Sequence, residues 1–116
     1  MDIIVCLKRV PDTETRVRFS DGSTVIEPEG VKYIVSPYDE FALEAAFRTT
    51  EMTEEGQVTV MTLGNEDSQE TLRAALAAGA DAAVLLRVQG SVTMDGLATA
   101  KTLAAELETR EEQLVL

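Results

Sequence analysis

The sequence predicts an α/β domain in which helices flank a mostly parallel, Rossmann-like sheet. Short apolar runs rich in Val, Ile and Leu, typical of buried parallel strands, alternate with longer stretches whose apolar residues recur at helical spacing. The chain has 116 residues, which is enough for one domain that buries roughly two-thirds of the surface of its unfolded form. We therefore expect residues 1–116 to form a single domain.

The first strand is expected at residues 3–7, where five consecutive apolar residues precede a charged pair and a proline. Small ligands bind beyond the carboxyl ends of parallel strands, so the polar turn expected at residues 8–12 is the first candidate site. Cys6 is expected to be a buried, unreactive thiol. Lys8 and Arg9 have two open interpretations, namely contact with a phosphate or partner subunit, and exposure in a solvated turn.

Residues 15–26 are expected to form a short β-hairpin, because apolar and polar residues alternate on both sides of a turn that contains Gly22. This hairpin lies within a connection that runs to about residue 35, and connections of such length are usually functional. We interpret it as an excursion that packs on the domain or on another subunit.

A helix is expected to begin at Ser36, with Pro37 in its first turn and Asp39 completing a capping box, and to end near Gly56. One side of this helix is rich in apolar residues. The residues expected on its buried face are Phe41, Ala42, Leu43, Ala45, Ala46 and Phe47.

Two more helices are expected at residues 67–79 and 95–109, between strands at 57–63, 82–86 and 113–116. Their apolar residues recur at intervals of three and four. The residues expected on their inner faces are Leu72, Ala75, Leu76 and Gly79 in the first, and Leu97, Ala100, Ala104 and Leu107 in the second.

The composition excludes several classes of function. The chain carries 21 Asp and Glu against 10 Lys and Arg, an acidic balance that argues against nucleic-acid binding, since such binding depends on neutralising phosphates. It has no histidine and one cysteine, so neither histidine catalysis nor a metal site is expected. No apolar run reaches membrane-spanning length and no basic leader is visible, so we expect a soluble intracellular protein without membrane insertion. Neither glycine-rich nucleotide fingerprint is present.

Four segments together resemble the β subunit of electron transfer flavoprotein. They are residues 5–12 (VCLKRVPD), 29–46 (EGVKYIVSPYDEFALEAA), 63–64 (LG) and 70–81 (ETLRAALAAGAD). Their order and spacing match that family over nearly the whole chain. The family's β subunit is about twice as long, so the chain resembles its N-terminal half, and we expect it to be truncated at its C-terminal end.

The resemblance implies a fold related to adenine nucleotide α hydrolase and universal-stress domains. It also implies an electron carrier, without bond-making catalysis of its own, that accepts electrons from flavin-dependent dehydrogenases and partners an α subunit carrying most of the FAD site. In many members of this family the β subunit binds AMP, and in bifurcating members it binds a second FAD instead. The resemblance also implies a cytoplasmic location in a bacterium or archaeon, or the mitochondrial matrix in a eukaryote. The nucleotide-binding residues implied by position are Cys6, Ser36, Pro37, Tyr38, Asp39, Leu63 and Gly64.

Two departures from the family pattern affect these expectations. Ser36 stands where the family commonly has Asn, although Ser is an equally good helix cap. The family's phosphate-binding loop follows the fourth strand, beyond Leu116, so we expect residues 1–116 to bind AMP weakly or not at all.

Tyr38 can stack on a base or pack on the sheet edge. The alternative function is a stand-alone adenine-nucleotide-binding regulatory domain of the universal-stress type.

Overall fold

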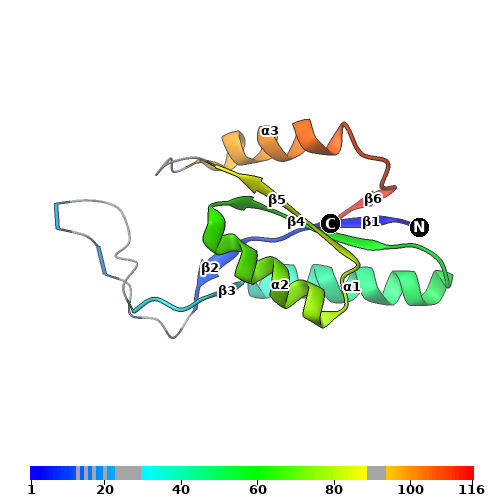
Figure 1. Cartoon of the computed structure of the whole chain (residues 1–116), viewed down its shortest axis with the longest axis horizontal. Coiled ribbons are helices and arrows are strands. Elements are labelled where there is room, and N and C mark those ends of the chain that lie inside the picture. Colours follow the sequence, from blue (N-terminus) through cyan, green and yellow to red (C-terminus); the bar gives the residue numbers. More distant parts are fainter. Residues whose placement is uncertain (13, 15, 17, 20, 23–29, 89–93) are drawn as a thin grey trace.

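A four-stranded parallel sheet forms the centre of the protein (Figure 1). The computed structural model describes residues 1–116 except 13, 15, 17, 20, 23–29 and 89–93. The strand order is β5-β4-β1-β6, so the first strand of the chain is an interior strand, as its sequence predicts. The strands span Ile3–Cys6 (β1), Val58–Gly64 (β4), Ala82–Arg87 (β5) and Leu114–Val115 (β6).

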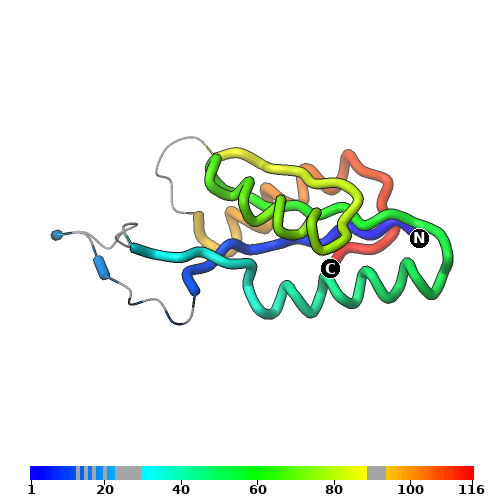
Figure 2. The backbone as a smooth tube through the Cα atoms, turned by 60° about the horizontal axis from the view of Figure 1, so that its bottom comes forward, coloured from blue at the N-terminus to red at the C-terminus, as the bar shows by residue number. Residues whose placement is uncertain are grey.

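Helices cover both faces of this sheet, which confirms the predicted α/β class. The helices α1 (Pro37–Thr53) and α2 (Gln69–Ala78) lie on one face, and α3 (Gly96–Leu107) lies on the other (Figures 1 and 2). A short 3-10 helix, η1 (Glu66–Ser68), leads into α2. The chain moves in one direction across the sheet from β1 through β4 to β5, and it then returns to β6 on the other side of β1. Because crossovers between parallel strands are right-handed, this change of direction places α3 on the opposite face from α1 and α2.

The main core lies between the sheet and the helices α1 and α2. Ile3 and Val5 are fully buried on this side, and Ile4 is fully buried on the opposite side, as expected for a strand covered on both faces. The buried residues that pack together in this core are Ile3, Val5, Leu7, Leu43, Ala46, Val58, Val60, Leu72, Ala75 and Ala80.

A separate two-stranded antiparallel ribbon stands beside the sheet. It pairs β2 (Arg9–Pro11) with β3 (Tyr33–Val35). The predicted polar turn at residues 8–12 is therefore wrong, since most of this segment is a paired strand. The predicted hairpin at residues 15–26 lies partly outside the described residues.

Two further contacts stabilise this ribbon. The Asp12 N–H donates to the Lys32 carbonyl oxygen at 2.7 Å, directly beyond the paired residues. The Arg9 guanidinium carbon lies 3.8 Å from the centre of the Tyr33 ring, a cation–π contact. Arg9 is thus held within the ribbon, which favours neither of the two roles considered for it from the sequence.

The ends of α1 differ from those predicted. The helix is capped by Ser36, but the side chain of this residue makes no capping hydrogen bond, so the predicted capping box is wrong. The helix ends at Thr53, and Glu54 adopts the left-handed conformation, with φ of 54°. Gly56 is needed for another reason, because a Cβ atom there would lie 2.0 Å from the Met1 carbonyl oxygen.

The helical faces were predicted only in part. Leu43 and Ala46 of α1 and Leu72 and Ala75 of α2 are buried as expected. Several residues predicted on inner faces are instead exposed, namely Phe41, Ala45, Leu76, Gly79, Leu97, Ala100 and Ala104. The half-buried residues of α3 are Ala98, Thr99, Thr102, Leu103, Glu106 and Leu107. In helices composed largely of Ala and Thr, spacing alone does not select one face, and packing on the sheet decides it.

Candidate functional site

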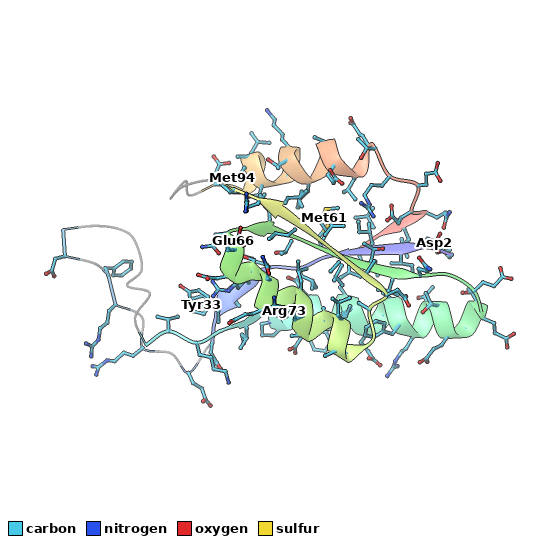
Figure 3. All side chains as sticks on the ribbon, in the orientation of Figure 1. Asp2, Tyr33, Met61, Glu66, Arg73 and Met94 are labelled. Atoms are coloured by element: carbon cyan, nitrogen blue, oxygen red, sulfur yellow. The ribbon has the colours of Figure 1, made fainter. Side chains whose placement is uncertain are left out.

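The sequence assigns three segments to the candidate site, and each of them either ends or begins at the carboxyl edge of the sheet. β1 ends at Cys6, α1 begins directly after Ser36, and β4 ends at Gly64. Cys6 is paired with Met61, so β4 continues three residues beyond the end of β1. Met61 lies on the sheet face that α3 covers (Figure 3). The return of the chain to β6 places the topological switch point of the sheet beside β1, where ligands of open α/β sheets bind.

Two hydrogen bonds join the segment after β1 to the start of α1. The Lys8 backbone N–H donates to Asp39 Oδ2 at 2.6 Å, and the Ser36 N–H donates to the Lys8 carbonyl oxygen at 2.8 Å. The first of these bonds is charge-assisted and hence strong. The Asp39 carboxylate also lies in the first turn of α1, where the helix dipole favours negative charge. Asp39 therefore joins strand to helix and does not cap its own helix.

A second connection holds the end of β1 against β4. The Leu7 N–H donates to the Met61 carbonyl oxygen at 2.7 Å, which extends the pairing of the two strands by one residue. The Thr62 hydroxyl then donates to the Leu7 carbonyl oxygen, also at 2.7 Å. Thr62 is 1% exposed, so this bond forms out of contact with water. The backbone that leads into the candidate site is consequently fixed from two sides.

Gly64 allows the chain to turn closely after β4. A Cβ atom at this position would lie 2.2 Å from the Ser68 hydroxyl oxygen, and Ser68 is itself buried. In the sheet, Gly64 is paired with Arg87 at the end of β5. The Arg87 guanidinium forms an ion pair with Glu66 at the start of η1. Our sequence reasoning missed this pair. The position of a cation directly after a predicted strand, at the same edge as the other site residues, is the signal that could have found it.

Cys6 is half-buried at the end of β1. Partial burial raises the pKa of its thiol, and the nearby Asp39 carboxylate raises it further. The thiolate is the reactive form of cysteine, so Cys6 remains protonated and unreactive at neutral pH. This agrees with the predicted unreactive thiol, although the side chain is half-buried and not fully buried.

The structure brings together only some of the predicted site residues. Ser36 and Asp39 are joined through Lys8, and Cys6 lies near enough to Asp39 for the carboxylate to act on its thiol. Leu63 and Gly64 lie at the end of the adjacent strand β4. Tyr38 is 84% exposed, which excludes packing on the sheet edge, one of the two interpretations left open for it. Pro37 is also exposed.

Open cavities of about 640, 350 and 310 Å³ lie elsewhere on the protein and share no residue with this site. The largest lies between the C-terminal half of α1 and the turn before β5, and it is lined in part by Glu51, Glu54 and Asp81. In the described part of the chain, no group of three or more acidic or cysteine side chains is arranged to hold a metal ion. No helix in that part has the length and apolar character needed to cross a membrane.

Comparison with known proteins links this arrangement to one family. The profile of the electron transfer flavoprotein domain matches residues 23–116. Protein FixA of Azorhizobium caulinodans is 43% identical over 104 residues, which cover 90% of this chain and 36% of that protein. The electron transfer flavoprotein β subunit of Thermoanaerobacterium thermosaccharolyticum is 40% identical over 99% of this chain and 44% of its own length. The corresponding subunit of Bradyrhizobium diazoefficiens is 34% identical over the whole chain and 46% of its own length. The chain spans less than half the length of each of these relatives.

Proposed function

Because the chain belongs to the electron transfer flavoprotein family, with β subunits of that family among its relatives, we propose that it binds an adenine nucleotide as the N-terminal part of such a subunit. The nucleotide is AMP, or a second FAD if the protein is of the bifurcating type. The observation that carries the proposal is the junction at the carboxyl edge of the sheet, where Asp39 holds the end of β1 against the start of α1 beside Cys6. Open α/β sheets bind nucleotides at this edge.

The chemistry of the junction suits the nucleoside part of a nucleotide. A helix N-terminus normally attracts anions, but the Asp39 carboxylate already occupies the first turn of α1 and would repel a phosphate. Carboxylate and carbonyl oxygens accept hydrogen bonds from ribose hydroxyls and from the adenine amino group. The proposed contacts to the nucleoside come from the side chains or backbone of Cys6, Ser36, Pro37, Tyr38, Asp39, Leu63 and Gly64.

The proposed partner is an α subunit that carries most of the FAD site, and the proposed electron donors are flavin-dependent dehydrogenases. FAD would supply the redox chemistry, while this chain binds nucleotide and shapes the site. The protonated state of Cys6 supports a structural role, because a neutral thiol is a poor nucleophile. We assign no bond-making step to the chain.

Purification of the protein in native form from its own source tests this function. We expect two different subunits by mass spectrometry, together with the absorbance of bound flavin. A single kind of subunit that carries ATP or AMP without flavin would contradict the proposal. It would support the alternative, a regulatory adenine-nucleotide-binding domain of the universal-stress type, whose parallel sheet would bind nucleotide at the same edge.

A pair of variants tests the proposed site within the native complex. Asp39→Ala removes the acceptor of the Lys8 N–H, whereas Glu40→Ala removes a neighbouring exposed carboxylate of the same helix turn. We expect the Asp39 variant to lose at least about tenfold in AMP affinity, the cost of about one charge-assisted hydrogen bond, and the Glu40 variant to retain it. Equal affinities for the two variants would exclude the junction as part of the nucleotide site.

A further inference from the structure

The β2–β3 ribbon leaves the rest of the protein directly at the proposed nucleotide site. β1 ends at Cys6 and β2 begins at Arg9. On the return, β3 ends at Val35 and α1 begins directly after Ser36. The segments that enter and leave the ribbon meet where the Ser36 N–H donates to the Lys8 carbonyl oxygen at 2.8 Å, and we call this contact the ribbon base. Figure 1 shows the ribbon beside the start of α1, apart from the four-stranded sheet.

The ribbon has few interactions of its own to keep it paired. It joins Arg9–Pro11 to Tyr33–Val35, and all six of these residues are only half-buried. Among these six, Val35 alone packs against the main core. A two-stranded ribbon is at best marginally stable by itself in water. Its pairing therefore depends on how firmly the rest of the protein holds the ribbon base.

Asp39 holds the ribbon base with its side chain. Its Oδ2 atom accepts from the Lys8 N–H at 2.6 Å, and the Lys8 carbonyl oxygen in turn accepts from Ser36. The first of these bonds is charge-assisted, and such bonds are among the stronger hydrogen bonds of proteins. Asp39 and Ser36 are also residues to which we assign nucleotide contacts. The same two residues thus serve the ribbon base and the proposed site.

Nucleotide binding and closure of the ribbon base consequently require the same arrangement. When the ribbon opens at its base, the bonds of Lys8 break, and Asp39 and Ser36 leave the positions in which they contact the nucleotide. A ligand that binds only the closed form shifts the equilibrium toward that form. At a nucleotide concentration of about 100 times Kd, openings that disrupt the site become about 100-fold rarer.

We propose that nucleotide binding stabilises the closed β2–β3 ribbon, so that occupancy of the site is transmitted to a separate surface of the protein. This inference rests on the proposed function and adds to it a coupling between two places. At the far end of the paired residues, the Asp12 N–H donates to the Lys32 carbonyl oxygen at 2.7 Å. Neither residue is assigned to the nucleotide site, so an effect of nucleotide on this bond has to pass through the ribbon.

Hydrogen exchange of the Asp12 amide in the native complex measures this coupling. The complex is freed of nucleotide by dialysis, its affinity for AMP is measured by calorimetry, and exchange is followed without AMP and at about 100 times the measured Kd. We expect the Asp12 N–H to exchange about 10- to 100-fold more slowly with AMP. The control is the Gln113 N–H, which donates to the Asp2 carbonyl oxygen at 3.0 Å at the amino edge of the sheet, and its exchange should slow less.

The coupling and the proposed function fail in different ways in this experiment. If AMP binds without slowing the exchange of Asp12, or if it slows Gln113 as much as Asp12, the coupling is overturned and the proposed function stands. If AMP does not bind to the native complex, the proposed function is contradicted, and the coupling is overturned with it.

Variants of Asp39 test the ribbon base in the absence of nucleotide. Asp39→Ala should speed the exchange of Asp12 at least about tenfold, because it removes about one charge-assisted hydrogen bond. Asp39→Asn retains an acceptor oxygen for the Lys8 N–H and should restore most of the protection. The matched control is Glu40→Ala, which removes an exposed carboxylate of the same helix turn and should leave the exchange unchanged. Circular dichroism confirms that each variant is folded. Equal exchange of Asp12 in the Asp39→Ala and Glu40→Ala proteins would overturn the proposal.

Discussion

Replacement of Thr62 by Val tests whether the bond between β4 and the end of β1 stabilises the protein. Val has nearly the same shape as Thr, so the change mainly removes the hydroxyl that donates to the Leu7 carbonyl oxygen. A buried acceptor left without its donor costs about 1–3 kcal/mol, and the extra methyl group returns somewhat less than 1 kcal/mol. The net loss in the free energy of unfolding is therefore about 1–2 kcal/mol. For a domain of this size, we expect the melting temperature to fall by about 3–10 °C.

Thr59→Val is the matched control, because Thr59 is also a buried threonine of β4. Within the described part of the chain its hydroxyl has no side-chain hydrogen bond, and the residue borders an open cavity. We expect this control to change stability by less than about 0.5 kcal/mol. Urea unfolding followed by circular dichroism measures both variants. If Thr62→Val is as stable as Thr59→Val, the hydroxyl does not hold the strand end and our account of this edge is incorrect.

Three further predictions concern charge and ligand binding. The hydrogen bond from Arg110 lowers the pKa of Glu112, so Glu112→Gln should lower the free energy of unfolding by about 1 kcal/mol at pH 7. The difference between the two proteins should disappear as the pH falls through the lowered pKa, and a difference that stays constant with pH would contradict this prediction. Asp39→Asn should lower the pKa of the Cys6 thiol and speed its reaction with a disulfide reagent at mildly alkaline pH, and an unchanged rate would exclude the charge effect. Residues 1–116 alone should bind AMP weakly or not at all, because the phosphate-binding loop that the family resemblance implies would follow the fourth strand, outside these residues. Calorimetric detection of micromolar affinity would contradict this prediction.

The strands of the four-stranded sheet could be predicted because their signals are local. Residues 3–7 form a continuous apolar run, and the structure places Ile3–Cys6 of this run in an interior strand, as the run predicts. Likewise Ser36 and Pro37 mark the start of α1 correctly. These features depend on residues that are close together in the sequence, so the sequence pattern alone is enough to predict them.

The site contacts could be predicted only partly because they join distant segments. Asp39 has the spacing of a capping box with Ser36, but its carboxylate instead accepts from Lys8, 31 residues earlier. The Arg9–Pro11 strand similarly depends on a partner that follows some twenty residues later, at Tyr33–Val35. Local rules give the candidate residues, and the sheet topology decides which of them meet.

The ribbon of β2 and β3 has a consequence for how this family can diversify. Asp12 and Lys32 are hydrogen-bonded directly beyond the paired strands, so this bond holds the two ends of the segment between them together, whatever its sequence or length. The entropy of closing such a loop grows slowly, by only about 0.6 kcal/mol for each doubling of its length. Insertions, deletions and exchanges between residues 12 and 32 should thus leave the main sheet and its core almost unaffected. Evolution, or an engineer, can vary this appendage independently of the fold.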